Sequence, residues 1–330
     1  MDPRTHPGSI LKLASRLPAH VDVYEVGPRD GLQNELRSVP LKEKIRLVNA
    51  LVAAGERRIE LTSFVSPKWI PQLADADELL ARVEKPPEVM FSALVPNLKG
   101  LERAKAAGLK EAAVFASATE THSRKNINKS IAEALRVAAA VTKGALAGGM
   151  RVRAYLSVVW GCPYEGVTSL ETVVDLARQL IDMGVYQLSL GDTIGVGIPT
   201  QTETILEAVL RHIPVSKLAL HLHDTRGTAL ANALVGMTFG VSTLDASIGG
   251  LGGCPYAPGA AGNLATEDLV NLLHGMGVET GIDLPRLVEA GEVAQELIGR
   301  KLSGKYLQAA LGERNRQAAR SQHPRESGPG

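Results

Sequence analysis

Cysteine, aromatic side chains and long apolar runs are all scarce in this sequence, and its charges are almost balanced. Two cysteines, Cys162 and Cys254, occur in 330 residues, which excludes a disulfide framework and predicts a reducing compartment such as the cytoplasm. Aromatic residues make up 4% of the chain, and 36 Lys and Arg face 35 Asp and Glu, so we expect no nucleic-acid partner. No apolar run approaches the about 20 residues of a transmembrane helix, so we expect no membrane partner either.

The chain does contain eight short apolar runs that alternate with longer amphipathic stretches. Each run is expected to be a strand buried on both faces. The runs cover residues 21–26, 58–61, 89–95, 112–116, 152–159, 187–190, 218–222 and 244–248. Eight strand–helix units over roughly 250 residues are typical of an α/β protein with the (β/α)8, or TIM, barrel fold. An open doubly wound sheet would more often carry a glycine-rich phosphate-binding turn after its first strand, where this chain has Gly27-Pro-Arg-Asp-Gly31.

The domain boundaries follow from the same pattern. Residues 1–20 form an N-terminal segment, and residues 21–300 form the barrel with one additional C-terminal helix near 284–297. Residues 301–330 form a tail. We expect this tail to be partly disordered, because residues 318–330 are polar and carry Pro and Gly.

Two histidines on the seventh predicted strand are the most informative residues. His221 and His223 are two positions apart, so their side chains point to the same face of a strand. A pair of imidazoles in a buried strand indicates metal ligation. The alternative is one packed, hydrogen-bonded histidine beside one exposed histidine, and this strand alone does not separate the two.

In a (β/α)8 barrel the chemistry takes place at the C-terminal ends of the strands, so polar residues there are candidates for the site. The candidates are Arg29 and Asp30 after the first strand, Glu60 in the second, Arg153 and Tyr155 on one face of the fifth, and Asp192 at the end of the sixth. Four of them, Arg29, Asp30, Glu60 and Asp192, have a structural alternative. An ion pair would explain the charged residues of the first two strands, and a turn cap would explain Asp192.

Barrel closure is expected to bring four polar residues together. Asp30, His221, His223 and Asn263 lie on strands one, seven and eight or on the loops that follow them, and strand eight pairs with strand one in a closed barrel. Imidazole nitrogens with carboxylate and amide oxygens suit an octahedral divalent ion such as Mg²⁺ or Mn²⁺. The lack of a thiolate argues against a structural zinc site.

The loop after the eighth strand, residues 249–259, is rich in glycine and carries Cys254. Its length and composition predict a mobile active-site lid that presents a thiol. The alternative is a flexible surface loop whose cysteine has no role.

Five segments of the chain form long and specific motifs. They are Val23-Tyr-Glu-Val-Gly-Pro-Arg-Asp-Gly-Leu-Gln-Asn-Glu35, Thr62-Ser-Phe-Val-Ser-Pro-Lys-Trp69, Gly161-Cys-Pro-Tyr-Glu-Gly166, Gly191-Asp-Thr-Ile-Gly-Val-Gly197 and Gly250-Leu-Gly-Gly-Cys-Pro-Tyr256. These segments resemble the 3-hydroxy-3-methylglutaryl-CoA (HMG-CoA) lyases. The resemblance covers every predicted strand end. It implies a metal-dependent retro-Claisen cleavage of the acyl-CoA substrate HMG-CoA into acetyl-CoA and acetoacetate, a reaction of leucine degradation and ketone-body formation.

The resemblance also implies how the metal site works. Asp30, His221, His223 and Asn263 would hold the metal against the substrate's tertiary hydroxyl and a carbonyl or carboxylate oxygen. A base, which would be His221, Asp30 or Asp192, would remove the hydroxyl proton as the carbon–carbon bond breaks.

Further roles are implied for residues around this site. Arg29 would stabilise the thioester enolate, and Glu60 would orient Arg29. Cys254 would deliver a proton to the enolate carbon or help to exclude water from it. The remaining implied substrate contacts are Gln33, Arg153 and Tyr155.

One position departs from the pattern of the family. After His223-Asp-Thr the family usually has Tyr, whereas this chain has Arg226, a cation that would bind a different or additional substrate carboxylate. This departure makes a lyase for a related branched 3-hydroxyacyl-CoA one alternative. Two further alternatives are a Claisen-type synthase of the same superfamily and a catalytically inactive barrel. The short chain after residue 297 favours the lyase over a synthase, the complete ligand set argues against an inactive barrel, and a homodimer is expected.

Overall fold

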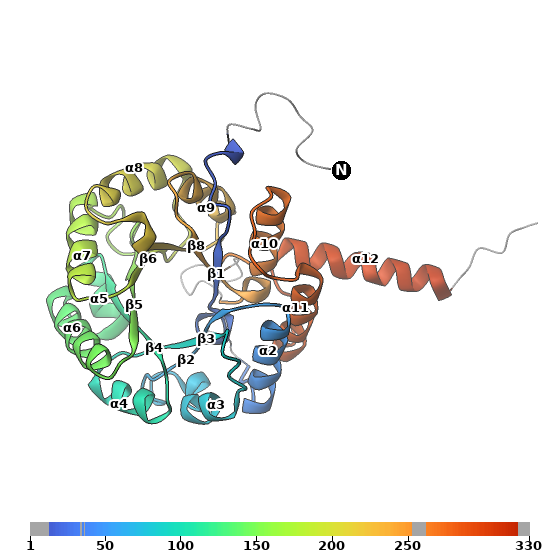
Figure 1. The fold of residues 1–330 in the computed structure, drawn as a ribbon, viewed down its shortest axis with the longest axis horizontal. Helices are drawn as coiled ribbons and strands as arrows, with labels where there is room; N and C mark the ends of the chain where they lie inside the picture. The colour runs from blue at the N-terminus through green and yellow to red at the C-terminus, as the bar shows by residue number, and fades with distance from the viewer. Residues whose placement is uncertain (1–12, 34, 36, 253–261, 323–330) are drawn as a thin grey trace, which may run out of the picture.

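The computed structural model describes residues 13–33, 35, 37–252 and 262–322, and eight parallel strands in this part of the chain close into a barrel. The strands follow one another in chain order, and β1 closes the barrel against β8 (Figure 1). Their bounds are β1 Asp22–Glu25, β2 Arg58–Ser63, β3 Met90–Leu94, β4 Glu111–Ser117, β5 Arg151–Ser157, β6 Gln187–Asp192, β7 Leu218–Leu222 and β8 Thr243–Ala246. The predicted (β/α)8 barrel is confirmed.

Helices form the outer layer of the barrel (Figure 1). Those that follow successive strands are α2 Leu41–Ala53, α3 Ala76–Arg82, α4 Leu98–Ala106, α6 Ile131–Ala147, α7 Leu170–Asp182, α8 Pro199–Leu210, α9 Ala229–Thr238 and α10 Thr266–Gly275. Polar residues fix several helix starts, because their side chains accept otherwise unpaired backbone N–H groups. Asn97 caps α4 in this way, and Ser130 forms a capping box with Glu133 at the start of α6.

Two helices were not expected from the sequence, and one of them lies in the tail. The additional helix near 284–297 is present as α11 Leu284–Ile298, whereas α5 Glu120–Ile127 and α12 Lys305–Gln322 were not predicted. The tail thus contains a long helix, and residues 323–330 lie outside the described residues. Figure 1 shows α12 starting beside α10 and α11 and then extending away from the barrel.

The interior of the barrel contains a buried polar layer beneath the C-terminal mouth. Arg153 on β5 donates from Nη1 to Asp245 Oδ2 on β8 at 3.1 Å and from Nε to Gln187 Oε1 at 2.9 Å. Ser189 Oγ donates to the same Asp245 oxygen at 2.9 Å. Tyr155 is two residues closer than Arg153 to the C-terminal end of β5, so it forms the next layer up. Within the described residues, no helix has the length and apolar character needed to cross a membrane.

Candidate active site and metal centre

The turn after β1 brings two charged side chains to the mouth of the barrel. Gly27–Gly31 form a π-helical turn, η2, and a Cβ atom at Gly27 would lie 2.5 Å from Glu25 Oε1, so glycine is required there. Arg29 Nη1 donates to Asp30 Oδ1 at 2.5 Å, and Arg29 Nε donates to Glu60 Oε2 at 2.6 Å. The expected contact between Glu60 and Arg29 is therefore present.

The same carboxylates keep Arg29 charged inside the protein. Burial alone would lower the pKa of Arg29, but Glu60 and Asp30 outweigh this effect and raise the pKa. For Glu60, burial dominates and raises the pKa, although Arg29 opposes this shift. Arg29 is thus a buried cation that two hydrogen bonds hold in one position.

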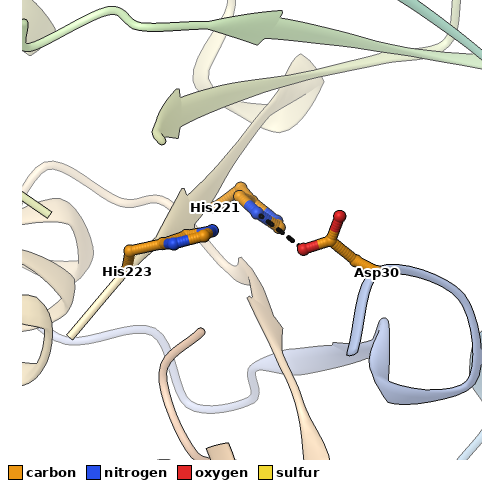
Figure 2. Close-up of side chains that lie close together, drawn as sticks. All are labelled: Asp30, His221 and His223. Atoms are coloured by element: carbon orange, nitrogen blue, oxygen red, sulfur yellow. Dashed lines mark ion pairs between the residues drawn. The ribbon is translucent and has the colours of Figure 1, made fainter. Parts of the chain in front are cut away.

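Three potential metal ligands come together from η2 and β7. One ligand atom from each of Asp30, His221 and His223 lies within 4.8 Å of the other two. Figure 2 shows the two imidazoles of β7 with the Asp30 carboxylate across from them. His221 Nε2 is 3.8 Å from Asp30 Oδ2, which is too long for a direct hydrogen bond. The three side chains form a candidate metal site.

The states of these groups fit a bound cation. His223 is 7% exposed, and its Nδ1 has no hydrogen-bond partner among the described residues. Burial, reinforced by His221, lowers the pKa of His223 to about 4, so its ring is neutral near pH 7. Burial would raise the pKa of Asp30, but Arg29 and the two histidines hold it well below its usual range. A neutral imidazole and an ionised carboxylate are the forms that ligate a metal.

Asp245, which the sequence argument did not single out, fixes the ring of His221. His221 Nδ1 lies 3.2 Å from Asp245 Oδ2, and Asp245 is 2% exposed. A carboxylate that accepts from one ring nitrogen leaves the other nitrogen, Nε2, available as a ligand. A signal for Asp245 was present, because it is an acid between two apolar residues of a predicted strand, as Glu60 is.

Asn263 lies beside the three candidate ligands. It forms an isolated β-bridge with His223, and its Nδ2 donates to Asp30 Oδ2 at 2.9 Å and to Leu251 O at 3.0 Å. The structure therefore shows Asn263 holding Asp30 in place. Ligation through its amide oxygen stays a prediction.

A cavity of about 940 Å³ opens at this end of the barrel. Its polar lining includes Arg29, Asp30, Gln33, Tyr155, His221 and His223. Tyr155 donates to Glu60 Oε2 at 3.1 Å, and the guanidinium carbon of Arg29 lies 5.5 Å from the centre of its ring. Gln33 Oε1 has no hydrogen-bond partner among the described residues. Both predicted contacts, Gln33 and Tyr155, are therefore placed where a ligand can meet them.

Two arginines that were expected to bind substrate have other partners. Arg153 is fully buried, pairs with Asp245 and Gln187, and does not line the cavity. Arg226 is exposed, and its Nη1 donates to the carbonyl oxygens of Ile194 at 2.7 Å and Gly195 at 3.2 Å. Neither arginine contacts the cavity, because one lies a layer too deep and the other holds the loop after β6.

The structure describes only one of the last two predicted catalytic residues, Asp192 and Cys254. Asp192 accepts backbone N–H groups from Val196 at 3.0 Å and Gly197 at 2.9 Å, which is the turn-capping alternative. Burial raises the pKa of Asp192 despite these bonds. Cys254, with the predicted lid, lies outside the described residues.

Comparisons with known proteins show the family of the chain. The HMGL-like family model matches residues 20–294. The mitochondrial hydroxymethylglutaryl-CoA lyase of Mus musculus is 52% identical over 293 residues, which cover 89% of this chain and 90% of the mouse protein.

Two crystal structures of HMG-CoA lyases also resemble the fold closely. That of the Bacillus subtilis lyase has a TM-score of 0.88 at 48% identity and covers 89% of this chain and 99% of that one. That of the Acinetobacter baumannii lyase, in complex with coenzyme A and 3-methylmalate, has a TM-score of 0.83 at 35% identity and covers 94% and 97%. With its barrel, its candidate metal site and its family match in agreement, this chain belongs to the HMGL-like family.

Proposed function

We propose that this protein cleaves HMG-CoA into acetyl-CoA and acetoacetate by a metal-assisted retro-Claisen reaction. The observation that carries the proposal is that a candidate metal site and a buried, fixed arginine share one cavity. The substrate is supported by relatives of 52% and 48% identity that are named hydroxymethylglutaryl-CoA lyases. The coenzyme A bound in the Acinetobacter structure supports a thioester of that cofactor.

Asp30, His221 and His223 would hold a divalent cation, with Asn263 as a further ligand. Imidazole and oxygen donors without a thiolate favour Mg²⁺ or Mn²⁺. When bound, the cation supplies Lewis acidity that polarises substrate oxygens and makes the tertiary hydroxyl more acidic.

Arg29 meets the charge that develops when the carbon–carbon bond breaks. The bonding electron pair passes to the acetyl thioester fragment, whose carbonyl oxygen becomes the enolate oxygen. Glu60 and Asp30 occupy Nε and Nη1 of Arg29, which leaves Nη2 to bind this oxygen. A pre-oriented donor at a developing oxyanion lowers the barrier by about 3–4 kcal/mol.

Two proton transfers complete the reaction. The hydroxyl proton leaves as the ketone of acetoacetate forms, and His221 and Asp30 are the two candidate bases that line the cavity. Asp192 instead holds the turn after β6. Cys254 then gives a proton to the enolate carbon, which forms the methyl group of acetyl-CoA; this role follows from the family resemblance.

The position of Arg226 supports the HMG group itself as the acyl group. A different or additional substrate carboxylate was considered only because of this extra cation. Arg226 donates to two backbone carbonyls and does not line the cavity. This extra cation therefore gives no reason to expect a related branched 3-hydroxyacyl-CoA as the substrate.

An assay of the purified protein with Mg²⁺ and HMG-CoA, coupled to detection of acetyl-CoA, tests the proposal. We expect turnover that chelation abolishes and added Mg²⁺ or Mn²⁺ restores. Turnover of another hydroxyacyl-CoA but not of HMG-CoA would refute the substrate. No turnover with any of these thioesters would refute the enzymatic function.

We further propose that the protein acts in the cytoplasm, as a homodimer, in leucine degradation. The cytoplasm is supported by the scarcity of cysteine, the pathway by the substrate, and the dimer by the frequent pairing of barrel enzymes. Cell fractionation, growth on leucine after deletion and light scattering of the purified protein test the three points separately.

A further inference from the structure

The connection between α11 and α12 packs against the backbone beside the metal site. We call residues 302–305 the C-terminal clamp. Gly304 N donates to Gly249 O at 2.9 Å, and Ser303 Oγ lies 3.4 Å from Gly250 O. Leu302, which is 2% exposed, fits so closely that a Cβ atom at Gly249 would lie 2.3 Å from its Cδ1. The clamp thus holds Ile248–Gly250, the short helix η5 that follows β8.

The last residue of the clamp reaches the side chain of Asp224. Lys305 Nζ donates to Asp224 Oδ2 at 2.8 Å. Asp224 directly follows the candidate ligand His223, and its backbone N–H donates to Gly262 O at 2.7 Å. Gly262 in turn directly precedes Asn263. Lys305 therefore contacts Asp224, the residue after His223, and the backbone of Asp224 is joined to the residue before Asn263 by a hydrogen bond.

The start of α12 fixes Lys305 in this position. Asp268 on α10 accepts the backbone N–H groups of Lys305 at 3.0 Å and Tyr306 at 2.6 Å, and Leu307 is fully buried. A carboxylate that caps the first N–H groups of a helix is stabilising. The backbone of Lys305 is thus fixed, although its side chain is 70% exposed.

We propose that Lys305 is a positioning residue for the metal centre, acting through Asp224 on the backbone that carries His223 and Asn263. The inference rests on the proposed function, because it assumes that these residues bind a divalent cation. It goes beyond that function in giving the C-terminal helix a role in metal binding.

Charge alone predicts a different result from positioning. If Lys305 acted only as a nearby positive charge, its removal would strengthen cation binding, and loss of the Asp224 charge would weaken it. If Lys305 and Asp224 act by holding the backbone, removal of either one weakens binding. The Lys305 variant therefore separates the explanations, whereas the Asp224 variant should weaken binding under either one.

The test measures Mn²⁺ binding to the full-length protein by calorimetry, without substrate. For Lys305→Met and for Asp224→Asn we expect the dissociation constant to rise about threefold to fivefold, the range of an exposed ion pair. Asp224 Oδ1 accepts the backbone N–H of Ala229, the first residue of α9, at 3.1 Å. Asn at position 224 keeps an acceptor there, so α9 should keep its start. Lys305→Arg should restore most of the affinity, since it keeps the cation.

Arg314→Met is the matched control. Arg314 lies on the same helix and forms ion pairs with Glu289 and Glu292 of α11, away from the metal site, so Mn²⁺ affinity should not change. Lys305→Met binding Mn²⁺ as tightly as the wild type, or more tightly, would overturn the inference. Failure of the wild type to bind Mn²⁺ would refute the metal centre itself, and wild-type binding without turnover of HMG-CoA would refute only the proposed reaction.

Discussion

Replacement of Glu60 by Gln tests whether the position of Arg29 limits catalysis. Glu60 is fully buried and accepts hydrogen bonds from Arg29 Nε at 2.6 Å and from the Tyr155 hydroxyl at 3.1 Å. Glutamine has the same shape and keeps one acceptor oxygen. It removes the negative charge, however, and it adds two N–H groups. Because Glu60 Oε1 has no hydrogen-bond partner among the described residues, an amide nitrogen can take that place without breaking a hydrogen bond.

The size of the effect follows from this environment. Removal of one partner of a buried ion pair costs about 3–5 kcal/mol, since the other charge stays buried and uncompensated. Part of this free-energy cost lowers the stability of the folded protein. The rest is avoided because Arg29 moves away from the position in which it would bind the enolate oxygen. A displacement of about 1 Å slows catalysis about 100-fold, and complete loss of an oxyanion donor slows it up to about 1000-fold. We expect kcat to fall about 100- to 1000-fold, with Mn²⁺ affinity and KM near those of the wild type.

Steady-state kinetics of the two single variants and the double variant test whether Glu60 acts through Arg29. If Glu60 works only through Arg29, the double variant Glu60→Gln/Arg29→Gln should be no slower than Arg29→Gln alone, because residues that act as one unit are not additive. A purely electrostatic role predicts the reverse for the single variant, since loss of a neighbouring carboxylate makes Arg29 a stronger cation. An unchanged or increased kcat for Glu60→Gln would therefore refute the positioning argument.

Other parts of the structure give further predictions. Burial raises the pKa of Glu267 to about 8, so the folded state keeps a proton that the unfolded state loses above about pH 4.5. The free energy of unfolding should therefore fall between pH 5 and 8. Thermal unfolding of Glu267→Gln should depend less on pH over this range. His223→Ala should lose the metal, whereas Cys254→Ser should lower turnover with unchanged metal content, as elemental analysis can show. Arg153→Gln leaves Asp245 buried without its cation and should lower the free energy of unfolding by about 3–5 kcal/mol in denaturant titrations. A large rise in its KM would instead restore Arg153 as a substrate contact.

The fold was predictable because strands buried on both faces leave a clear pattern. The predicted strand 218–222 coincides with β7 Leu218–Leu222, since every residue of it is buried and apolar except His221. The start of α12 was not predictable, because the acid that caps it, Asp268, lies on a different helix. Local sequence does not show such a tertiary cap, and the polar composition of residues 318–330 pointed toward disorder.

The candidate site was predictable where topology alone brings residues together. Closure of β8 against β1 makes neighbours of Asp30, His221 and His223, whatever the details of the loops. The sequence did not show how deep a side chain lies in the barrel or which conformation a loop adopts. The strand period correctly put Arg153 and Tyr155 on one face, but it could not show that only Tyr155 reaches the cavity.

Arg153 nevertheless contributes to the site from below, through Asp245. Burial would raise the pKa of Asp245, but Arg153 and His221 lower it, so this carboxylate stays ionised inside the barrel. An ionised carboxylate 3.2 Å from His221 Nδ1 favours a proton on that nitrogen, and in the neutral ring Nε2 then carries the lone pair. The buried ion pair thus selects the tautomer in which His221 can ligate a cation. Arg153, an implied substrate contact, thus lies one layer below the cavity and acts on Asp245, the carboxylate beside His221.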